Sequence, residues 1–98
     1  MFVVMNRLRV EDAYRPRLEE AFRHSGERMK QVPGCLRFLL LNEKESNLYI
    51  VYTEWQDEQA YQAWINSPHF QQAHAQSQGP SQTQSELETF EVLFASVV

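Results

Sequence analysis

The run FVVMNRLRV at residues 2–10 decides how this chain folds, because it predicts a β-strand with one polar residue on its apolar side. Successive side chains of a strand point to opposite faces, so one face carries Phe2, Val4, Asn6, Leu8 and Val10. Four of these residues are apolar and favour a core, whereas Asn6 carries an amide with two hydrogen-bond donors and an acceptor. A buried amide without partners is costly, so local backbone or a ligand must meet it.

The rest of the chain alternates helical and extended patterns. Apolar residues three and four positions apart, such as Leu18 and Phe22, indicate a helix, and stretches of β-forming residues indicate strands. The expected elements are a helix within residues 11–31, regular from about Arg15 and stopped by Pro33-Gly34; strands over Cys35–Asn42 and Leu48–Trp55; a helix capped by Asp57; a short helix from Ser67 through His74; a loop at residues 76–85; and a strand over residues 86–97.

This order of strand, helix, strand, strand, helix, strand is the split βαβ pattern. It predicts an α+β chain with a ferredoxin-like βαββαβ fold, an antiparallel sheet and a single domain over residues 1–98. The second strand contains Phe38, Leu39, Leu40 and Leu41 and is therefore apolar on both faces. The face away from the helices needs cover, and the simplest cover is the sheet of a second copy. We therefore expect a homodimer that forms a dimeric α/β barrel.

Charge and cysteine content exclude some partners. The formal net charge is −4, and the basic residues are scattered, so the chain lacks the basic stripe expected of a DNA- or RNA-binding protein. The single Cys35 cannot form an internal disulfide, and its apolar neighbours favour an inert thiol over a nucleophile. The first apolar run is too short for a signal peptide, and no stretch has the length of a membrane span. These features predict a cytoplasmic protein that does not bind membranes.

Three residues are candidates for a functional site: Asn6, Trp64 and His74. Taken singly, each has an ordinary explanation, as a hydrogen-bonded amide, a core filler and a surface histidine. On one unbroken helix, Trp64 and His74 would lie about 15 Å apart along the axis and face different sides. Ser67-Pro68 breaks that helix, because Ser is a good N-cap and Pro a good first residue. The second segment can then turn back, so that the indole and the imidazole address a common cavity near Asn6.

Four short patterns occur in order along the chain: FxxxNRL from Phe2, TxW from Thr53, AYxxW from Ala60, and SxxFxxAH from Ser67 to His74. In this combination the chain resembles the IsdG-type heme-degrading monooxygenases, a group within the antibiotic biosynthesis monooxygenase superfamily of dimeric ferredoxin-like barrels. The resemblance covers about three quarters of the chain. Each pattern alone is weak, and their specificity lies in the combination.

The resemblance implies that heme is both cofactor and substrate. His74 would match the proximal ligand, which bonds the iron through a neutral ring nitrogen, and Asn6 would match the distal amide that donates a hydrogen bond to dioxygen. Trp64 would match the bulky residue that distorts the porphyrin out of plane, and Phe70 could pack against the ring. With O2 and an unidentified electron donor, the macrocycle would open and release iron.

One stretch departs from the pattern expected of these enzymes. Residues 75–78 are Ala-Gln-Ser-Gln, without the basic residues that could meet the heme propionates. Arg23, Arg28 and Lys30 on the first helix are alternatives, although each is equally well explained as part of a solvated helix face. Propionate recognition is therefore left open.

Two other functions fit the same fold. A cofactor-independent monooxygenase of the superfamily would act on a quinol or polyketide-like aromatic and would need no iron ligand. A non-catalytic dimer could bind or carry heme, or could serve as a stress protein. The large Trp64 favours heme degradation over the first alternative, because a rigid wedge has little purpose against a small flexible substrate. The acidic composition and the missing basic segment favour the second alternative mildly.

Overall fold

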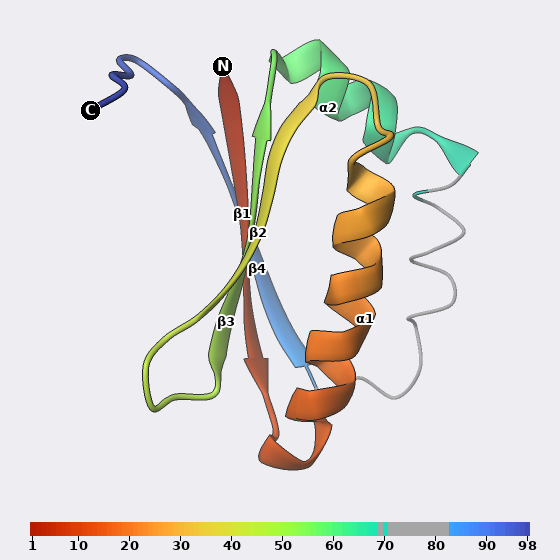
Figure 1. The fold of residues 1–98 in the computed structure, drawn as a ribbon, viewed down its shortest axis with the longest axis vertical. Coiled ribbons are helices and arrows are strands. Elements are labelled where there is room, and N and C mark those ends of the chain that lie inside the picture. The colour runs from red at the N-terminus through yellow and green to blue at the C-terminus, as the bar shows by residue number, and fades with distance from the viewer. Residues whose placement is uncertain (69, 71–82) are drawn as a thin grey trace.

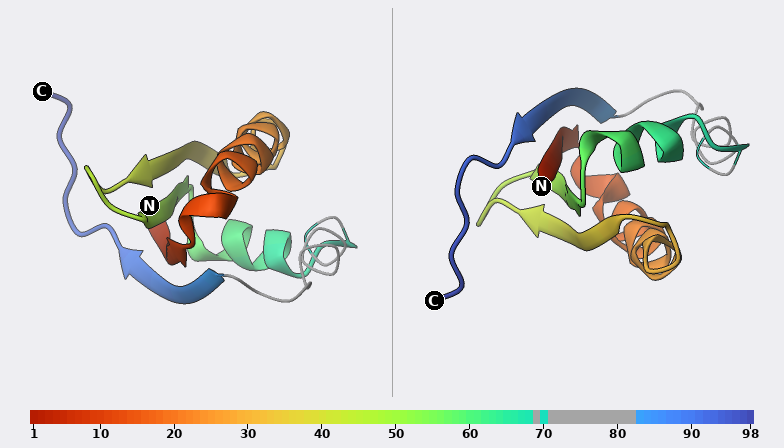
Figure 2. Two further views of the ribbon diagram at one scale, coloured as in Figure 1. Left: turned by 90° about the horizontal axis from the view of Figure 1, so that it is seen from below. Right: turned by 90° about the horizontal axis from the view of Figure 1, so that it is seen from above.

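Four antiparallel strands form one sheet with two helices against one of its faces in the computed structural model, which describes residues 1–68, 70 and 83–98 (Figures 1 and 2). The elements in chain order are β1 (Phe2–Val10), the 3-10 turn η1 (Asp12–Tyr14), α1 (Arg15–Met29), β2 (Cys35–Asn42), β3 (Leu48–Trp55), α2 (Glu58–Ile65) and β4 (Thr83–Glu91). The strands lie in the order β2-β3-β1-β4. The predicted ferredoxin-like α+β fold is thereby confirmed.

Strand β1 lies in the middle of the sheet, where β3 and β4 both pair with it. Asn6 lies opposite Val51 on β3 and opposite Leu87 on β4, and Val4 lies opposite Thr53. The face that carries Phe2, Val4, Asn6, Leu8 and Val10 is the one that the helices cover, as the strand pattern predicts. We call the other side the open face.

Both helices begin where the sequence predicts, at a proline in the first turn and at an N-cap residue. Helix α1 starts at Arg15 with Pro16 in its first turn, and α2 is capped by the Asp57 carboxylate, which accepts a hydrogen bond from the Ala60 N–H at 2.8 Å. Helix α1 ends at Met29, short of the predicted limit of 31, because the backbone already turns at residues 30–34.

Gly34 closes the turn between α1 and β2. Its φ of +82° lies in the left-handed region, and a Cβ at this position would approach the Ala60 Cβ to 2.4 Å. The Gly34 carbonyl also accepts a hydrogen bond from the Gln56 N–H at 2.8 Å. Only glycine fits here, because the turn is both left-handed and pressed against α2.

The last strand departs from the sequence prediction. It covers Thr83–Glu91 rather than residues 86–97, since residues 83–91 complete the pairing along the whole of β1. Pairing with a long central strand outweighs the low strand propensity of single residues. Beyond Glu91, the Val92 N–H bonds to the Met1 carbonyl at 3.0 Å. The other part of the predicted loop, residues 76–82, lies outside the described residues.

The apolar side chains on the helix-covered face form two separate core clusters. The first core cluster comprises Phe2, Val4, Met29, Trp55 and Tyr61, and the second comprises Leu8, Val10 and Tyr49. Leu18 and Phe22 of α1 pack on the second cluster, which confirms the face predicted for that helix. None of the helices within the described ranges is both long enough and apolar enough to cross a membrane.

The open face keeps large apolar side chains in solvent. Leu39, Leu41 and Phe90 are 38%, 42% and 42% exposed, respectively. The segment after β4 leads away from the sheet (Figure 1). Its Leu93 and Phe94 side chains are 92% and 84% exposed. In the two end views of the sheet, both helices lie on the side away from the open face (Figure 2).

Candidate functional site

Asn6 interrupts the core in the middle of β1. Its neighbours on the same face, Val4 and Leu8, belong to the first and second core clusters, so the gap between the clusters falls on the amide. The Asn6 Oδ1 atom is buried and has no hydrogen-bond partner among the described residues. A buried polar atom left in this state costs about 1–3 kcal/mol. A loss of folding stability of this kind is expected at a position that serves function rather than stability.

Trp64 projects from α2 toward the same face of the sheet. It packs against the first core cluster together with Ala60 and Ile65, so these three side chains form the apolar face of α2. The centre of its ring lies 5.7 Å from that of Trp55 and 4.5 Å from that of Phe70, the latter in an edge-to-face arrangement at 72°. The indole therefore belongs to an aromatic group that borders the break at Asn6, because Val4 is part of the same cluster.

Ser67 builds the predicted break after α2. Its hydroxyl donates to the Trp64 carbonyl at 2.6 Å and accepts from the Phe70 N–H at 3.2 Å. One side chain thus ends the first helical segment and caps the next, as the Ser-Pro pair predicts. His74, which is predicted to follow on this segment, lies outside the described residues, and so do residues 75–78.

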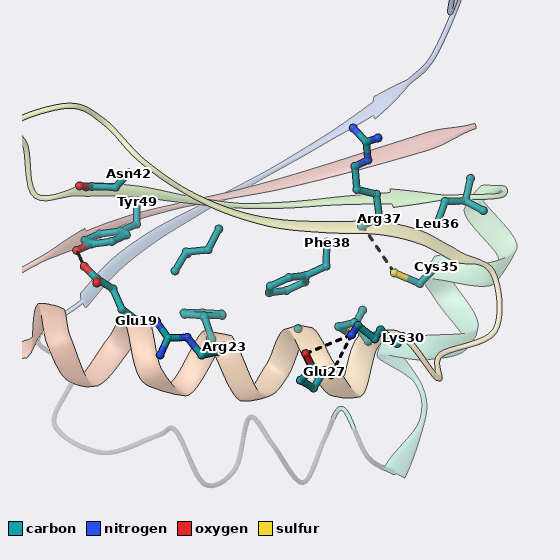
Figure 3. Close-up of a pocket in the computed structure, with 14 residues that line it drawn as sticks. Glu19, Arg23, Glu27, Lys30, Cys35, Leu36, Arg37, Phe38, Asn42 and Tyr49 are labelled. Atoms are coloured by element: carbon teal, nitrogen blue, oxygen red, sulfur yellow. Dashed lines mark hydrogen bonds and ion pairs between the residues drawn. The ribbon is translucent and has the colours of Figure 1, made fainter. Parts of the chain in front are cut away.

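A groove of about 650 Å³ lies between α1 and β2 (Figure 3). Phe22, Met29 and Phe38 line its apolar part. Neither Asn6 nor Trp64 lines it, so this groove is distinct from the break in the core. The common cavity for Asn6, Trp64 and His74 accordingly stays a prediction.

Two of the candidate propionate partners, Arg23 and Lys30, stand at the rim of this groove (Figure 3). Each is paired on its own helix, Arg23 with Glu20 at 3.1 Å and Lys30 with Glu27 at 3.0 Å. Both side chains are mostly exposed, so these pairs are weak and could exchange for another carboxylate. Arg23 and Lys30 therefore lie beside a groove that Asn6 does not line.

Cys35 also lines the groove and is half-buried. Burial raises the pKa of its thiol, which keeps the sulfur protonated at neutral pH. The nearest polar contact of Sγ is the Arg37 carbonyl at 3.9 Å, so no described group activates it. These observations agree with the inert thiol expected from the sequence.

A polar network around the buried Tyr49 lies at the far end of the sheet from Trp64. Tyr49 is 1% exposed, donates its hydroxyl proton to Glu19 and accepts from the Arg15 Nε at 3.0 Å. Burial is the main cause that raises the pKa of Tyr49. The network ties α1 to β3 and to Asn42, which Arg15 contacts at 3.3 Å, so its role is to hold the helix on the sheet.

Sequence reasoning gave no role to Trp55, which packs on Trp64, or to Thr53, which bonds to Trp55. Trp55 is fully buried, and its indole N–H donates to the Thr53 hydroxyl at 3.0 Å. The signal that could have found them is the TxW pattern at Thr53, which combines a strand hydroxyl with an indole two residues later on the same face.

Comparison with known proteins identifies the family of this chain. Residues 1–76 match the family described as antibiotic biosynthesis monooxygenase. A heme oxygenase (mycobilin-producing) of Mycobacterium tuberculosis is 34% identical over 92 residues, which cover 93% of this chain and 88% of the relative.

Two solved structures share the fold and are at least 25% identical in sequence to this chain. The heme degrader MhuD of Mycobacterium tuberculosis, with two hemes bound in its active site, superposes with a TM-score of 0.79 at 32% identity, over 99% of this chain and 100% of the other. A mutant of SnoaB, a cofactor-independent oxygenase of Streptomyces nogalater, superposes with a TM-score of 0.81 at 25% identity, over 96% and 94% of the two chains. On the match over residues 1–76 and the 34% identity, the chain belongs to the antibiotic biosynthesis monooxygenase family.

Proposed function

We propose that this protein is a heme-degrading monooxygenase that binds heme as its substrate, opens the porphyrin with O2 and electrons, and releases the iron. The observation that carries the proposal is the break in the core at Asn6, where a buried amide oxygen has no partner among the described residues. The 34% identity to a mycobilin-producing heme oxygenase supports the choice of heme.

The residues present fit such a substrate. The iron supplies the redox chemistry when heme is bound, so the protein needs ligation, orientation and shape rather than an acid–base pair. We assign His74 as the iron ligand through a neutral ring nitrogen. We assign Asn6 as the hydrogen-bond donor on the opposite side of the ring, and Phe70 as a packing residue.

The amide of Asn6 suits that role because it does not titrate near neutral pH. Its oxygen and nitrogen are interchangeable by a half-turn of the side chain, so the buried position can also hold the NH2 group. A neutral donor in a dry position keeps one orientation without gaining or losing a proton. That is how Asn6 would favour one geometry of the reacting oxygen.

Trp64 is assigned as the residue that distorts the porphyrin. Its indole is rigid and large, and it is held against Trp55 and Phe70 by ring contacts of 5.7 and 4.5 Å. A side chain can deform a flat ring only if it is supported from behind. The aromatic group around Trp64 offers that support.

We further propose that the protein acts as a homodimer in the cytoplasm. The exposed Leu39 and Leu41 of the open face and the exposed Leu93 and Phe94 after β4 support self-association, because apolar side chains of this size are normally covered. The unbridged Cys35 suits a reducing compartment. The nine-residue pairing of β4 with β1 supports one domain that extends past residue 76 to residue 98.

A hemin titration tests the function. Purified protein mixed with hemin should give a Soret band typical of histidine ligation, and His74→Ala should lose that band. His24→Ala is the matched control, because His24 is 68% exposed on α1 beside Glu20 and should leave the spectrum unchanged. Absence of hemin binding by the wild type would contradict the proposal.

Turnover is tested next with ascorbate as the reductant and catalase present. Loss of the Soret band together with iron captured by a chelator supports degradation, whereas a stable spectrum indicates a heme carrier. The 25% identity to a SnoaB mutant favours the cofactor-independent oxygenase as the second candidate function. Oxygen consumption with a hydroxylated polycyclic aromatic, without added heme and unaffected by His74→Ala, would support that candidate.

A further inference from the structure

Trp55 is the most deeply buried aromatic residue near the proposed heme-distorting indole. It is 0% exposed at the end of β3, and its ring centre lies 5.7 Å from that of Trp64 and 5.6 Å from that of Tyr61. Its angle to Trp64 is 36°, so the two indoles lie partly face to face. Trp55 therefore fills the volume behind Trp64 on the sheet side.

A hydrogen bond fixes the orientation of the Trp55 ring. The indole N–H donates to the Thr53 hydroxyl at 3.0 Å, in a buried position. A buried indole N–H without an acceptor is unfavourable, so the ring has one preferred rotation about its side-chain bonds. Thr53 is itself only 8% exposed, so the bond is shielded from solvent.

The Thr53 hydroxyl also reaches the strand that carries Asn6. It donates to the Val4 carbonyl at 3.5 Å, and Val4 is both the cross-strand partner of Thr53 and the residue two positions before Asn6. One hydroxyl thus joins β1, which holds the amide, to the ring that backs the Trp64 indole. The two halves of the proposed site share a buried polar link.

We propose that Trp55 is a positioning residue, held by Thr53, that acts through Trp64 to set how far a bound porphyrin is bent out of plane. The proposal rests on the heme-degrading function given above. A force on the Trp64 indole from a bound ring passes to Trp55, whose rotation the Thr53 hydrogen bond resists. Loss of that bond lets both indoles yield, so the porphyrin relaxes toward planarity while its binding contacts are kept.

The first test needs no heme. The chain has two tryptophans, so labelling with 5-fluorotryptophan gives two fluorine resonances, which Trp55→Phe and Trp64→Phe assign. Thr53→Val keeps the shape of the side chain and removes the hydroxyl. We expect it to shift the Trp64 resonance by more than its line width, whereas Thr53→Ser, which keeps the hydroxyl, should restore the wild-type position.

Thr89→Val is the matched control for the loss of a threonine hydroxyl. Thr89 pairs with Val4 from the other side, on β4, and is exposed. It should leave both fluorine resonances in place. An unchanged Trp64 resonance in Thr53→Val would overturn the proposal, as would an equal shift in Thr89→Val.

The second test uses protein loaded with hemin. Resonance Raman spectra of the cyanide complex report out-of-plane modes, which we expect to weaken in Thr53→Val and in Trp55→Phe toward the level of Trp64→Ala. The hemin dissociation constant and KM should change little, whereas kcat should fall by between about tenfold and a hundredfold. A residue with only a structural role would lower the unfolding midpoint without this split between kcat and KM.

The outcomes separate this proposal from the function on which it rests. If wild type neither binds nor degrades hemin, the proposed function fails and this role fails with it. If wild type degrades hemin and Trp64→Ala flattens the ring, but Thr53→Val keeps wild-type Raman modes and kcat, only the role of Trp55 is wrong. Because Thr53→Val removes a single hydroxyl, it keeps the test decisive even if Trp55→Phe does not fold.

Discussion

At the scale of single residues, Asn6 contrasts with Asn42, the other asparagine whose side chain lies on the helix-covered face. The Asn42 amide donates to the Ser46 and Leu48 carbonyls, each at 3.0 Å, and so holds the β2–β3 hairpin. The Asn6 Oδ1 atom is buried and meets no partner among the described residues. Two residues of one type therefore have opposite effects on stability, because hydrogen bonding differs between their sites.

Replacing Asn6 by Leu tests this contrast. Asn6→Leu keeps the branched shape of the side chain and removes a buried oxygen that has no partner among the described residues, so we expect the free energy of unfolding to rise by about 1 kcal/mol in urea titrations. The same variant should lose hemin turnover. Asn42→Leu is the control and should lower the free energy of unfolding by about 1 kcal/mol or more, because three side-chain hydrogen bonds are lost, two to backbone carbonyls and one from Arg15. A destabilised Asn6→Leu would show that the amide is bonded in solution and that its position is structural.

At the scale of elements, the turn between α1 and β2 is the most constrained connection. Gly34 adopts a φ of +82° and stands where any Cβ would meet the Ala60 Cβ at 2.4 Å. Helix α2 carries Ala60 and, one turn later, Trp64. The closeness of this turn to α2 therefore fixes the distance of that helix from the end of the sheet.

We expect Gly34→Ala to lower the free energy of unfolding by about 2 kcal/mol or more, since it combines a left-handed backbone with a steric clash. Gly26→Ala is the matched control. It lies inside α1, where alanine favours the helix by about 1 kcal/mol, and its Cβ would meet only the Phe38 ring, at 3.3 Å. Urea denaturation should show a loss at residue 34 and little change at residue 26. Equal effects would contradict the close approach to α2.

The limits of elements with strong local signals could be predicted from the sequence. Strands β1, β2 and β3 follow from β-forming residues, and the start of α2 follows from the Asp57 cap. The limits of β4 could not, because they depend on the length of β1 rather than on residues 83–91 themselves. Partners brought together by the fold set that strand, and no local pattern records them.

The residues of the candidate site also fall into those that the sequence singles out and those that it does not. Asn6 stands out in the sequence because it breaks a period of two, and Ser67 because Ser-Pro marks a helix start. Thr53 and Trp55 appear in the sequence only as the short TxW pattern, which gives neither residue a role, since a hydroxyl and an indole are ordinary residues of a buried strand. Their importance depends on the Trp64 ring, which comes from an element that is separate in the chain.

At the scale of the whole molecule, the open face and the segment after β4 are two apolar surfaces that the described part of the chain leaves without cover. If both are buried in a homodimer, light scattering should give twice the chain mass at micromolar concentration. Leu41→Asp, or Leu93→Asp combined with Phe94→Asp, should shift the mass toward that of one chain, because a charge would be buried at the contact.

Ala63→Asp is the control for this experiment, because Ala63 is exposed on α2, away from both surfaces. It should leave the mass unchanged. A wild type with the mass of one chain would disprove the homodimer. Dissociation by Ala63→Asp as well would mean that added charge alone, rather than its position, weakens the association.

The exposed residues at the end of the chain also affect how the protein should be produced. Leu93 and Phe94 extend beyond the last strand with their side chains in solvent, and Val97 and Val98 follow them. A purification tag or fluorescent fusion at the carboxyl end would be attached directly to this apolar segment. It would hinder the contact between the segment and any surface that covers it. Placing the fusion before Met1, with a spacer long enough to clear the Val92 bond to the Met1 carbonyl, would leave that stretch free.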